Sequence, residues 1–257
     1  MSDNANHQMV VTGAPQDKSS TPRSAARSTL SVLRNHPFFC DLAPEALDQL
    51  CRYAKHASLK RGSTIFSRGD AGSCLFAVIS GTVKISISSV DGRNAILNLI
   101  GAGEIFGEMS VLDGQARSTD ATANTGCEIF AIDRREFLPF MRNQPELAMK
   151  FIELLCMRVR RTSDQVEQVI LQNLPGRLAG ALIRLTEKDK HVSGGRTIAI
   201  TQQEISEMVG MTRESINKQL RVWAGRSWVR LEHGAIVVLD AAPLQALAEA
   251  GADSEGA

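Results

Sequence analysis

The sequence predicts an α+β protein with three consecutive parts: an antiparallel β-roll of jelly-roll type, one long helix, and a small helical domain with a hairpin. Three observations lead to this prediction. Short runs of alternating apolar residues, separated by turn residues, fill the stretch from Ala57 to about Asp133. Apolar residues with a helical period then extend from Pro145 to about Gln172. Two short capped helices follow on either side of Gly210.

Changes in composition set the expected boundaries of these parts. Residues 1–28 are rich in small polar residues and almost lack large apolar ones, which is typical of a disordered tail. The remaining boundaries follow from the patterns described below. We expect the β-roll over residues 29–142, the long helix over 143–173, the helical domain with its hairpin over 174–240, and a short helix and tail over 241–257.

Composition excludes several classes of function. The chain has 257 residues, 43% of them hydrophobic, and a formal net charge of +1, so a nucleic-acid surface would have to be a local basic patch. No apolar run approaches a membrane span and no signal peptide is apparent, so we expect a cytoplasmic protein without a membrane partner. The five cysteines are scattered without a C-x-x-C pair, which predicts inert thiols and no metal site.

Within the β region, four runs read as strands. Turn residues separate them, and Asp91-Gly92 between two alternating runs indicates a hairpin. The absence of a strand–helix–strand rhythm argues against a dinucleotide-binding fold. The predicted strands cover residues 64–67, 75–79, 83–87 and 95–100.

The loop over residues 106–118 is the most informative part of this region. Gly107 lets backbone N–H groups approach a ligand, and the turn before Arg117 brings its guanidinium back beside the Ser118 hydroxyl. Arginine, hydroxyl and exposed amides together suit a phosphate, and Glu108 could accept a hydrogen bond from a sugar hydroxyl. The alternative is an ordinary surface hairpin in which Arg117 pairs with a carboxylate.

The long helix begins at Pro145 and ends near Asn173, where Leu174-Pro175-Gly176 predicts a stop and a hinge at Asn173. Its apolar residues are spaced almost as in a coiled coil, with the polar pair Thr162-Ser163 in or beside the seam. A buried core helix is the alternative, but the pattern favours a dimer seam. The predicted seam residues are Phe151, Leu155, Val159, Val166 and Val169.

The last part reads as a winged helix–turn–helix. Thr201 caps a helix over 202–209 with a capping box, and Thr212 caps a second helix from Arg213 to about Trp223. Runs at 229–231 and 236–239 form a hairpin, the wing. The exposed residues of the second helix can reach base edges or phosphates, although a solvated charged face is the alternative. They are Arg213, Glu214, Asn217, Lys218 and Arg221.

A β-roll, a long helix and a winged helix–turn–helix, in this order, resemble the CRP/FNR family of bacterial transcription regulators over about residues 35–240. Residues 106–108 through Arg117-Ser118 look like the phosphate-binding cassette of that family. Thr162-Ser163 are similar to the adenine-contacting pair of its cyclic-AMP receptor branch. Residues 212–215 with Lys218 are similar to the recognition helix of that branch.

The resemblance implies a role for each matching residue. Arg117 and Ser118 would hold the cyclic phosphate, Glu108 the ribose 2′-hydroxyl, and Gly107 would supply a backbone contact. Thr162 would bond the adenine from the same subunit and Ser163 from the other. On the DNA side, Arg213, Glu214 and Lys218 would read bases, while Thr201, Gln203, Thr212 and Ser215 would contact phosphates. Asn217 departs from the small residue that the branch tends to carry, which leaves the neighbouring base preference open.

The resulting hypothesis is a homodimeric regulator that binds palindromic double-stranded DNA in response to cyclic AMP, with cyclic GMP as another ligand to consider. The resemblance also implies RNA polymerase as a partner and no prosthetic group. Two alternatives stay open: a regulator of this fold that needs no nucleotide or responds to another small ligand, and a nucleotide-binding module that gates an enzyme or channel. An enzyme is not expected, because no nucleophile–base pair, Walker loop or metal cluster is apparent.

Overall fold

The computed structural model describes residues 33–89, 94–188 and 196–249. The predicted tail over 1–28, the Asp91-Gly92 turn and the end of the chain after Glu249 lie outside these residues. The chain divides into two compact units, Met1–Val83 with Ile100–Leu147 and Lys84–Leu99 with Ala148–Ala257. We describe each unit by itself.

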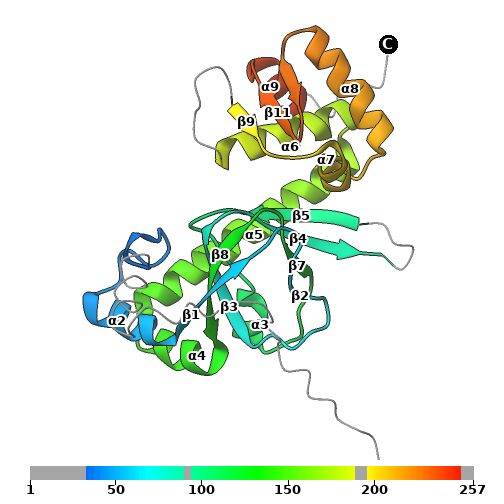
Figure 1. Cartoon of the computed structure of the whole chain (residues 1–257). Coiled ribbons are helices and arrows are strands. Elements are labelled where there is room, and N and C mark those ends of the chain that lie inside the picture. The colour runs from blue at the N-terminus through cyan, green and yellow to red at the C-terminus, as the bar shows by residue number, and fades with distance from the viewer. Residues whose placement is uncertain (1–32, 90–93, 189–195, 250–257) are drawn as a thin grey trace, which may run out of the picture. The chain divides into compact units, whose positions relative to one another are not determined.

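Two four-stranded sheets build the β-roll (Figure 1). One has the strand order β1-β8-β3-β6 and the other β2-β7-β4-β5. The antiparallel roll and the four strands expected from alternation are therefore confirmed. The strands are β1 (Ala54–Leu59), β2 (Thr64–Phe66), β3 (Cys74–Ser80), β4 (Val83–Ser88), β5 (Asn94–Ile100), β6 (Ile105–Phe106), β7 (Asp120–Ala123) and β8 (Cys127–Asp133).

The core of the roll lies around β3, whose first five residues are all buried. Antiparallel pairing with β8 on one side and β6 on the other leaves β3 in the middle of its sheet. Phe76 of β3 stacks on Phe106 of β6 with ring centroids 5.0 Å apart, and Phe66 of β2 lies 5.9 Å from Phe76. These aromatic contacts fix β6 and the segment that follows it.

Three helices belong to the first of the two units: α2 (Pro44–Tyr53), α3 (Glu108–Asp113) and α4 (Arg134–Arg142). Sequence analysis did not predict α4, which begins directly after β8 and is capped by the Asp133 side chain. It also failed to predict α3, because a six-residue helix is too short for a periodic pattern. The segment expected to be a loop with a turn at Asp113-Gly114 is thus partly helical.

The long helix is confirmed as α5 (Pro145–Leu171). The prediction that Phe151 lies in an outward seam is wrong, because this side chain is only 2% exposed within the single chain. Leu147 and Phe151, one turn apart, form an inward apolar stripe that the sequence pattern does not separate from the outward one. The other predicted seam residues, Leu155, Val159, Val166 and Val169, are partly or largely exposed.

The C-terminal part contains the predicted winged helix–turn–helix, packed around the buried Trp223 and Leu220. The predicted end of the long helix is confirmed, since α5 ends at Leu171 and Asn173 is not helical. Pro175 and Gly176 already lie in the first turn of α6, where proline is tolerated. The elements are α6 (Leu174–Lys188), β9 (Arg196–Ile198), α7 (Gln202–Val209), α8 (Arg213–Gly225), β10 (Val229–Glu232), β11 (Ala235–Val238) and α9 (Ala242–Glu249).

All five cysteines are free thiols. Across the described parts of the chain, His, Cys, Asp and Glu side chains nowhere gather in a group of three that could hold a metal ion. Within the same residues, every helix is too short or too polar to cross a membrane.

The turn from β6 into α3 requires glycine. Gly107 has a φ of 76°, a left-handed conformation that side chains disfavour. A Cβ here would also lie 2.8 Å from Arg117 Nη1 and 3.1 Å from Phe76 Cδ2. Gly62 has a similar φ of 83° but nothing within 4 Å of a Cβ. The two glycines therefore differ in crowding and share the same backbone strain.

We expect Gly107→Ala to destabilise the roll more than Gly62→Ala does. The Gly62 variant should lose about 1 kcal/mol from backbone strain alone. The Gly107 variant should lose at least about 1 kcal/mol more, because Arg117 and Phe76 must move. Chemical unfolding of both variants measures the difference, and equal losses would show that the cassette is not packed as described.

Candidate functional site

Two hydrogen bonds hold the backbone of Arg117 in place. Its N–H donates to Asp70 O at 2.8 Å, and its carbonyl accepts from Gly69 N at 2.8 Å. These two bonds hold the segment that enters β7 against the turn after β2. The side chain therefore starts from a defined point beside β3 and β6.

The Arg117 guanidinium is buried, and the residue is only 4% exposed. Nη1 donates to Gly107 O at 2.7 Å, and Nη2 donates to Cys74 O at 2.6 Å. Its central carbon lies 4.2 Å from the centre of the Phe66 ring, a cation–π contact. Burial lowers the pKa of Arg117, but arginine still carries its charge at any physiological pH. The alternative of a simple pair with a carboxylate is not what the structure shows, since both hydrogen-bond acceptors of the guanidinium are main-chain carbonyls.

Glu108 and Ser118 complete the group predicted in this loop. Glu108 is the first residue of α3 and is 1% exposed, and its negative charge opposes the lowering of the Arg117 pKa. Ser118 follows Arg117 and is exposed. The structure thus brings Gly107, Glu108 and Arg117 together, with Ser118 beside them. A cation, a carboxylate and a helix N-terminus in one place can bind an anion and a hydroxyl of the same ligand.

Sequence reasoning missed the residues that hold Arg117 in place. Cys74 acts through its carbonyl, so the identity of its side chain gives no indication of this role. Phe66 and Phe76 read as ordinary strand core, and only the fold places their rings against the guanidinium. Gly72 packs directly against Ser110 of α3, because a Cβ at Gly72 would overlap the Ser110 side chain.

Thr162 and Ser163 belong to the second unit and are exposed on α5. The Thr162 hydroxyl donates to Arg158 O at 2.9 Å, and the Ser163 hydroxyl donates to Val159 O at 3.1 Å. Each hydroxyl proton is thus used within the helix, which leaves the oxygen lone pairs to accept from outside.

The two caps predicted in the helix–turn–helix are confirmed. Thr201 N donates to Glu204 Oε2 at 2.7 Å and the Thr201 hydroxyl accepts from Glu204 N, a complete capping box. The Thr212 hydroxyl accepts from Ser215 N at 3.2 Å and donates to the Ser215 hydroxyl. Gly210, with a φ of 72°, makes the turn between the two helices. Gln203 donates to Glu207 along the exposed side of α7.

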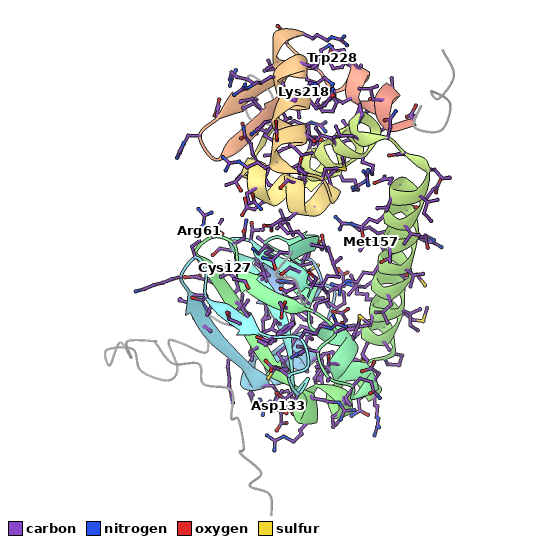
Figure 2. All side chains as sticks on the ribbon, turned by 90° about the vertical axis from the view of Figure 1, so that its right-hand side faces the viewer. Arg61, Cys127, Asp133, Met157, Lys218 and Trp228 are labelled. Carbon is purple, nitrogen blue, oxygen red and sulfur yellow. The ribbon has the colours of Figure 1, made fainter. Side chains whose placement is uncertain are left out.

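The outer face of α8 carries the polar residues predicted to meet DNA. Arg213, Glu214 and Lys218 are exposed, and Asn217 lies half-buried between them. Figure 2 shows the Lys218 side chain on this helix. The opposite face is buried, with Ile216, Leu220 and Trp223 in the core of the domain. Arg221 and Val222 extend the outer face towards the C-terminal end of the helix.

Comparison with known families identifies both domains. Residues 56–144 match the cyclic nucleotide-binding domain, and residues 176–247 match the Crp-like helix-turn-helix domain. The first match contains the Arg117 site, and the second contains α7, α8 and the wing.

Several relatives align over almost their whole length. A CRP-like cAMP-activated global transcriptional regulator of Mycobacterium tuberculosis is 32% identical over 212 residues, 81% of this chain and 95% of that protein. The cyclic AMP receptor protein of Thermus thermophilus is 32% identical over 216 residues, 84% of this chain and 98% of that protein. A solved CRP/FNR-family transcriptional regulator of Thermus thermophilus is 27% identical with a TM-score of 0.65, covering 76% of this chain and 98% of that one. With both domains in place and relatives of this similarity, the chain belongs to the CRP/FNR family of cyclic-nucleotide-responsive, DNA-binding transcription regulators.

Proposed function

We propose that this protein is a homodimeric regulator that binds cyclic AMP in its β-roll and palindromic DNA through α8. The observation that carries the proposal is the buried Arg117 guanidinium beside Glu108 and Gly107 in a cyclic nucleotide-binding domain. Relatives that are 32% identical are named as cAMP-activated or as a cyclic AMP receptor, which supports cyclic AMP as the ligand.

Arg117 has the donors that a cyclic phosphate needs. A guanidinium carries five N–H groups, and the hydrogen bonds to Gly107 and Cys74 use one each from Nη1 and Nη2. Its Nε has no hydrogen-bond partner among the described residues. A phosphate reaching this group would therefore find an unmet donor in a buried setting, where charge-assisted hydrogen bonds are strong. Ser118 can add a hydroxyl, and Glu108 can accept from the ribose.

We expect calorimetry to show micromolar binding of cyclic AMP, weakened at least about 100-fold in Arg117→Ala. Loss of charge-assisted bonds of about 1.5–3 kcal/mol each accounts for this factor. Arg61→Ala removes an exposed arginine of the same domain and should bind as the unmodified protein does. Two controls separate lost binding from lost folding. Thermal unfolding without nucleotide shows whether Arg117→Ala still folds, and Ser118→Ala removes a predicted phosphate contact at an exposed position. No heat from a folded wild-type protein would favour the constitutive alternative, and titration with cyclic GMP tests the second ligand.

The dimer follows from a second apolar stripe on α5. Seven exposed residues recur at alternating steps of three and four, which is the heptad spacing of a two-stranded coiled coil. We call them the heptad face: Met149, Ile152, Cys156, Val159, Ser163, Val166 and Ile170. Their apolar members are between 51% and 72% exposed in the single chain. A second copy of the same helix fits this face, because the helices of a two-stranded coiled coil pack heptad stripe against heptad stripe. Val159 and Val166 thus stay in the proposed seam, and Phe151 leaves it.

Val159→Glu should convert the dimer into a monomer. A charge at the centre of the heptad face would lose its hydration in the dimer without gaining a partner. Met157→Glu is the matched control, because Met157, labelled on α5 in Figure 2, is 56% exposed. Its place in the heptad lies off the heptad face. Size-exclusion chromatography with light scattering gives the mass of each variant. A dimeric Val159 variant would contradict the seam, as would a monomeric Met157 variant.

DNA recognition rests on the outer face of α8. Arg213 and Glu214 lie in its first turn and Lys218 one turn later, where a recognition helix meets base edges. Arginine or lysine can bond guanine, and glutamate can accept from cytosine. The hydroxyls of Thr201, Thr212 and Ser215 lie at the two helix N-termini, where phosphates are favoured, and Gln203 lies beside them. A dimer would present two such helices to two inverted half-sites.

Sites selected from random DNA should be palindromes with half-site centres about one helical turn apart. On a selected site with cyclic AMP present, Arg213→Ala should weaken binding about 10- to 100-fold, which corresponds to roughly 1–3 kcal/mol for one base contact. Arg142→Ala removes one positive charge from an exposed position on α4 and should change affinity little. Fluorescence anisotropy at fixed salt measures all three proteins. Equal losses in both variants would mean that charge alone, and not base reading, carries the binding.

A further inference from the structure

Two different arginines hold the two ends of α3. At the N-terminal end, Arg117 Nη1 donates to the carbonyl of Gly107, the N-cap residue. At the C-terminal end, Arg134 Nε donates to Val111 O at 2.7 Å. The Arg134 guanidinium also lies over Gly114, because a Cβ on that glycine would be 3.2 Å from Arg134 Nη2. Neither the sequence pattern nor the family resemblance singled out Arg134.

Arg134 is itself held firmly. It is the first residue of α4, directly after β8, and its N–H donates to Ser73 O at 2.8 Å. The next residue along that strand, Cys74, pairs with Asp133 and gives its carbonyl to Arg117. Arg134 and Arg117 are therefore anchored on two adjacent residues at the start of β3, Ser73 and Cys74 respectively. Figure 2 labels Asp133 at this end of β8.

A helix as short as α3 depends on such contacts. Six residues form few internal hydrogen bonds, and isolated helices of this length are unstable in water. The last carbonyls of a helix lack partners within it, and a cation there satisfies one of them and complements the helix dipole. Glu108 and the amides after Gly107 keep their positions only while the whole segment is held. A phosphate that engages the unpartnered Arg117 Nε leaves the attachment through Arg134 unchanged.

We propose that Arg134 is a positioning residue for nucleotide binding, which holds α3 so that Glu108 and Gly107 face the ligand. This inference rests on the proposed binding of cyclic AMP at Arg117. Arg134 touches no ligand and acts through Val111. It also joins the cassette directly to α4, the helix that precedes α5 in the chain.

The chain offers a matched control in the neighbouring residue. The Arg135 side chain is 88% exposed and pairs with Asp133 at 3.2 Å. Arg135→Ala removes the same side chain and the same charge as Arg134→Ala, but it removes no contact with α3. Arg134→Ala removes the bond to Val111, and Arg134→Lys keeps a cation that can reach the same carbonyl.

The first test is calorimetry with cyclic AMP and with its 2′-deoxy form on the full-length protein. Arg134→Ala should weaken cyclic AMP binding at least about tenfold, Arg134→Lys should recover part of that loss, and Arg135→Ala should stay within about twofold. If Arg134 orients Glu108, the preference of the wild type for the ribose 2′-hydroxyl should also shrink in Arg134→Ala. A general loss of folding would not change this ratio. Wild-type affinity in Arg134→Ala, or equal weakening in Arg135→Ala, overturns the inference while leaving the nucleotide site in place.

The second test needs no nucleotide. Amide hydrogen exchange of the ligand-free protein should be faster over residues 111–114 in Arg134→Ala and unchanged there in Arg135→Ala. If the wild type fails to bind cyclic AMP, the proposed function falls and the positioning role falls with it, whatever this test shows. Unchanged exchange in Arg134→Ala would show that Arg134 does not hold α3.

Discussion

The β-roll depends on one buried cation, the guanidinium of Arg117. A buried charge is costly unless it is hydrogen-bonded, and here two main-chain carbonyls and the face of Phe66 compensate it. The carbonyls come from Gly107 and Cys74, so one side chain ties the β6–α3 turn to β3. The same group is the proposed phosphate ligand. Folding of the cassette and binding of the nucleotide therefore act on the same few hydrogen-bond donors, and each influences the other.

This arrangement explains why the cassette surrounding Arg117 is so constrained. Gly107 and Gly114, both left-handed, mark the two ends of α3, and Gly72 lets β3 approach Ser110 without a side chain between them. None of these glycines offers a side chain to a ligand, although Gly107 is predicted to supply a backbone contact. They allow a six-residue helix to lie close enough to the sheet for Arg117 and Arg134 to reach its carbonyls. The shape of the proposed site is thus set by backbone contacts more than by the side chains that a ligand would touch.

The sequence predicted much of this molecule because most of its elements are periodic. The four strands with alternating residues, the long helix and the capped pair around Gly210 each leave a local pattern, and the structure contains all of them. It could not predict α3, because a six-residue helix is too short for a periodic pattern and its contacts with Arg117 and Arg134 appear only in the fold. It placed Phe151 in the outward seam, since two apolar stripes on one helix overlap in a one-dimensional pattern. It predicted Arg117 as a ligand residue but could not predict its burial, because the acceptors are carbonyls.

The composition of the heptad face bears on how a nucleotide could control the proposed dimer. Large apolar residues occupy its ends, but Cys156 and Ser163 take two of its inner positions. A small polar residue in a seam lowers the stability of a coiled coil and helps to fix its register. Because Cys156 and Ser163 add little apolar contact, the helix pair can change its geometry at these two positions at lower cost than at the apolar ends. A ligand shifts such an equilibrium only by its different affinity for the two states, and a few kcal/mol suffice. Ser163, which the family resemblance assigns to the nucleotide of the other subunit, is one of these two residues, so a ligand contact there would act directly on the proposed helix pair.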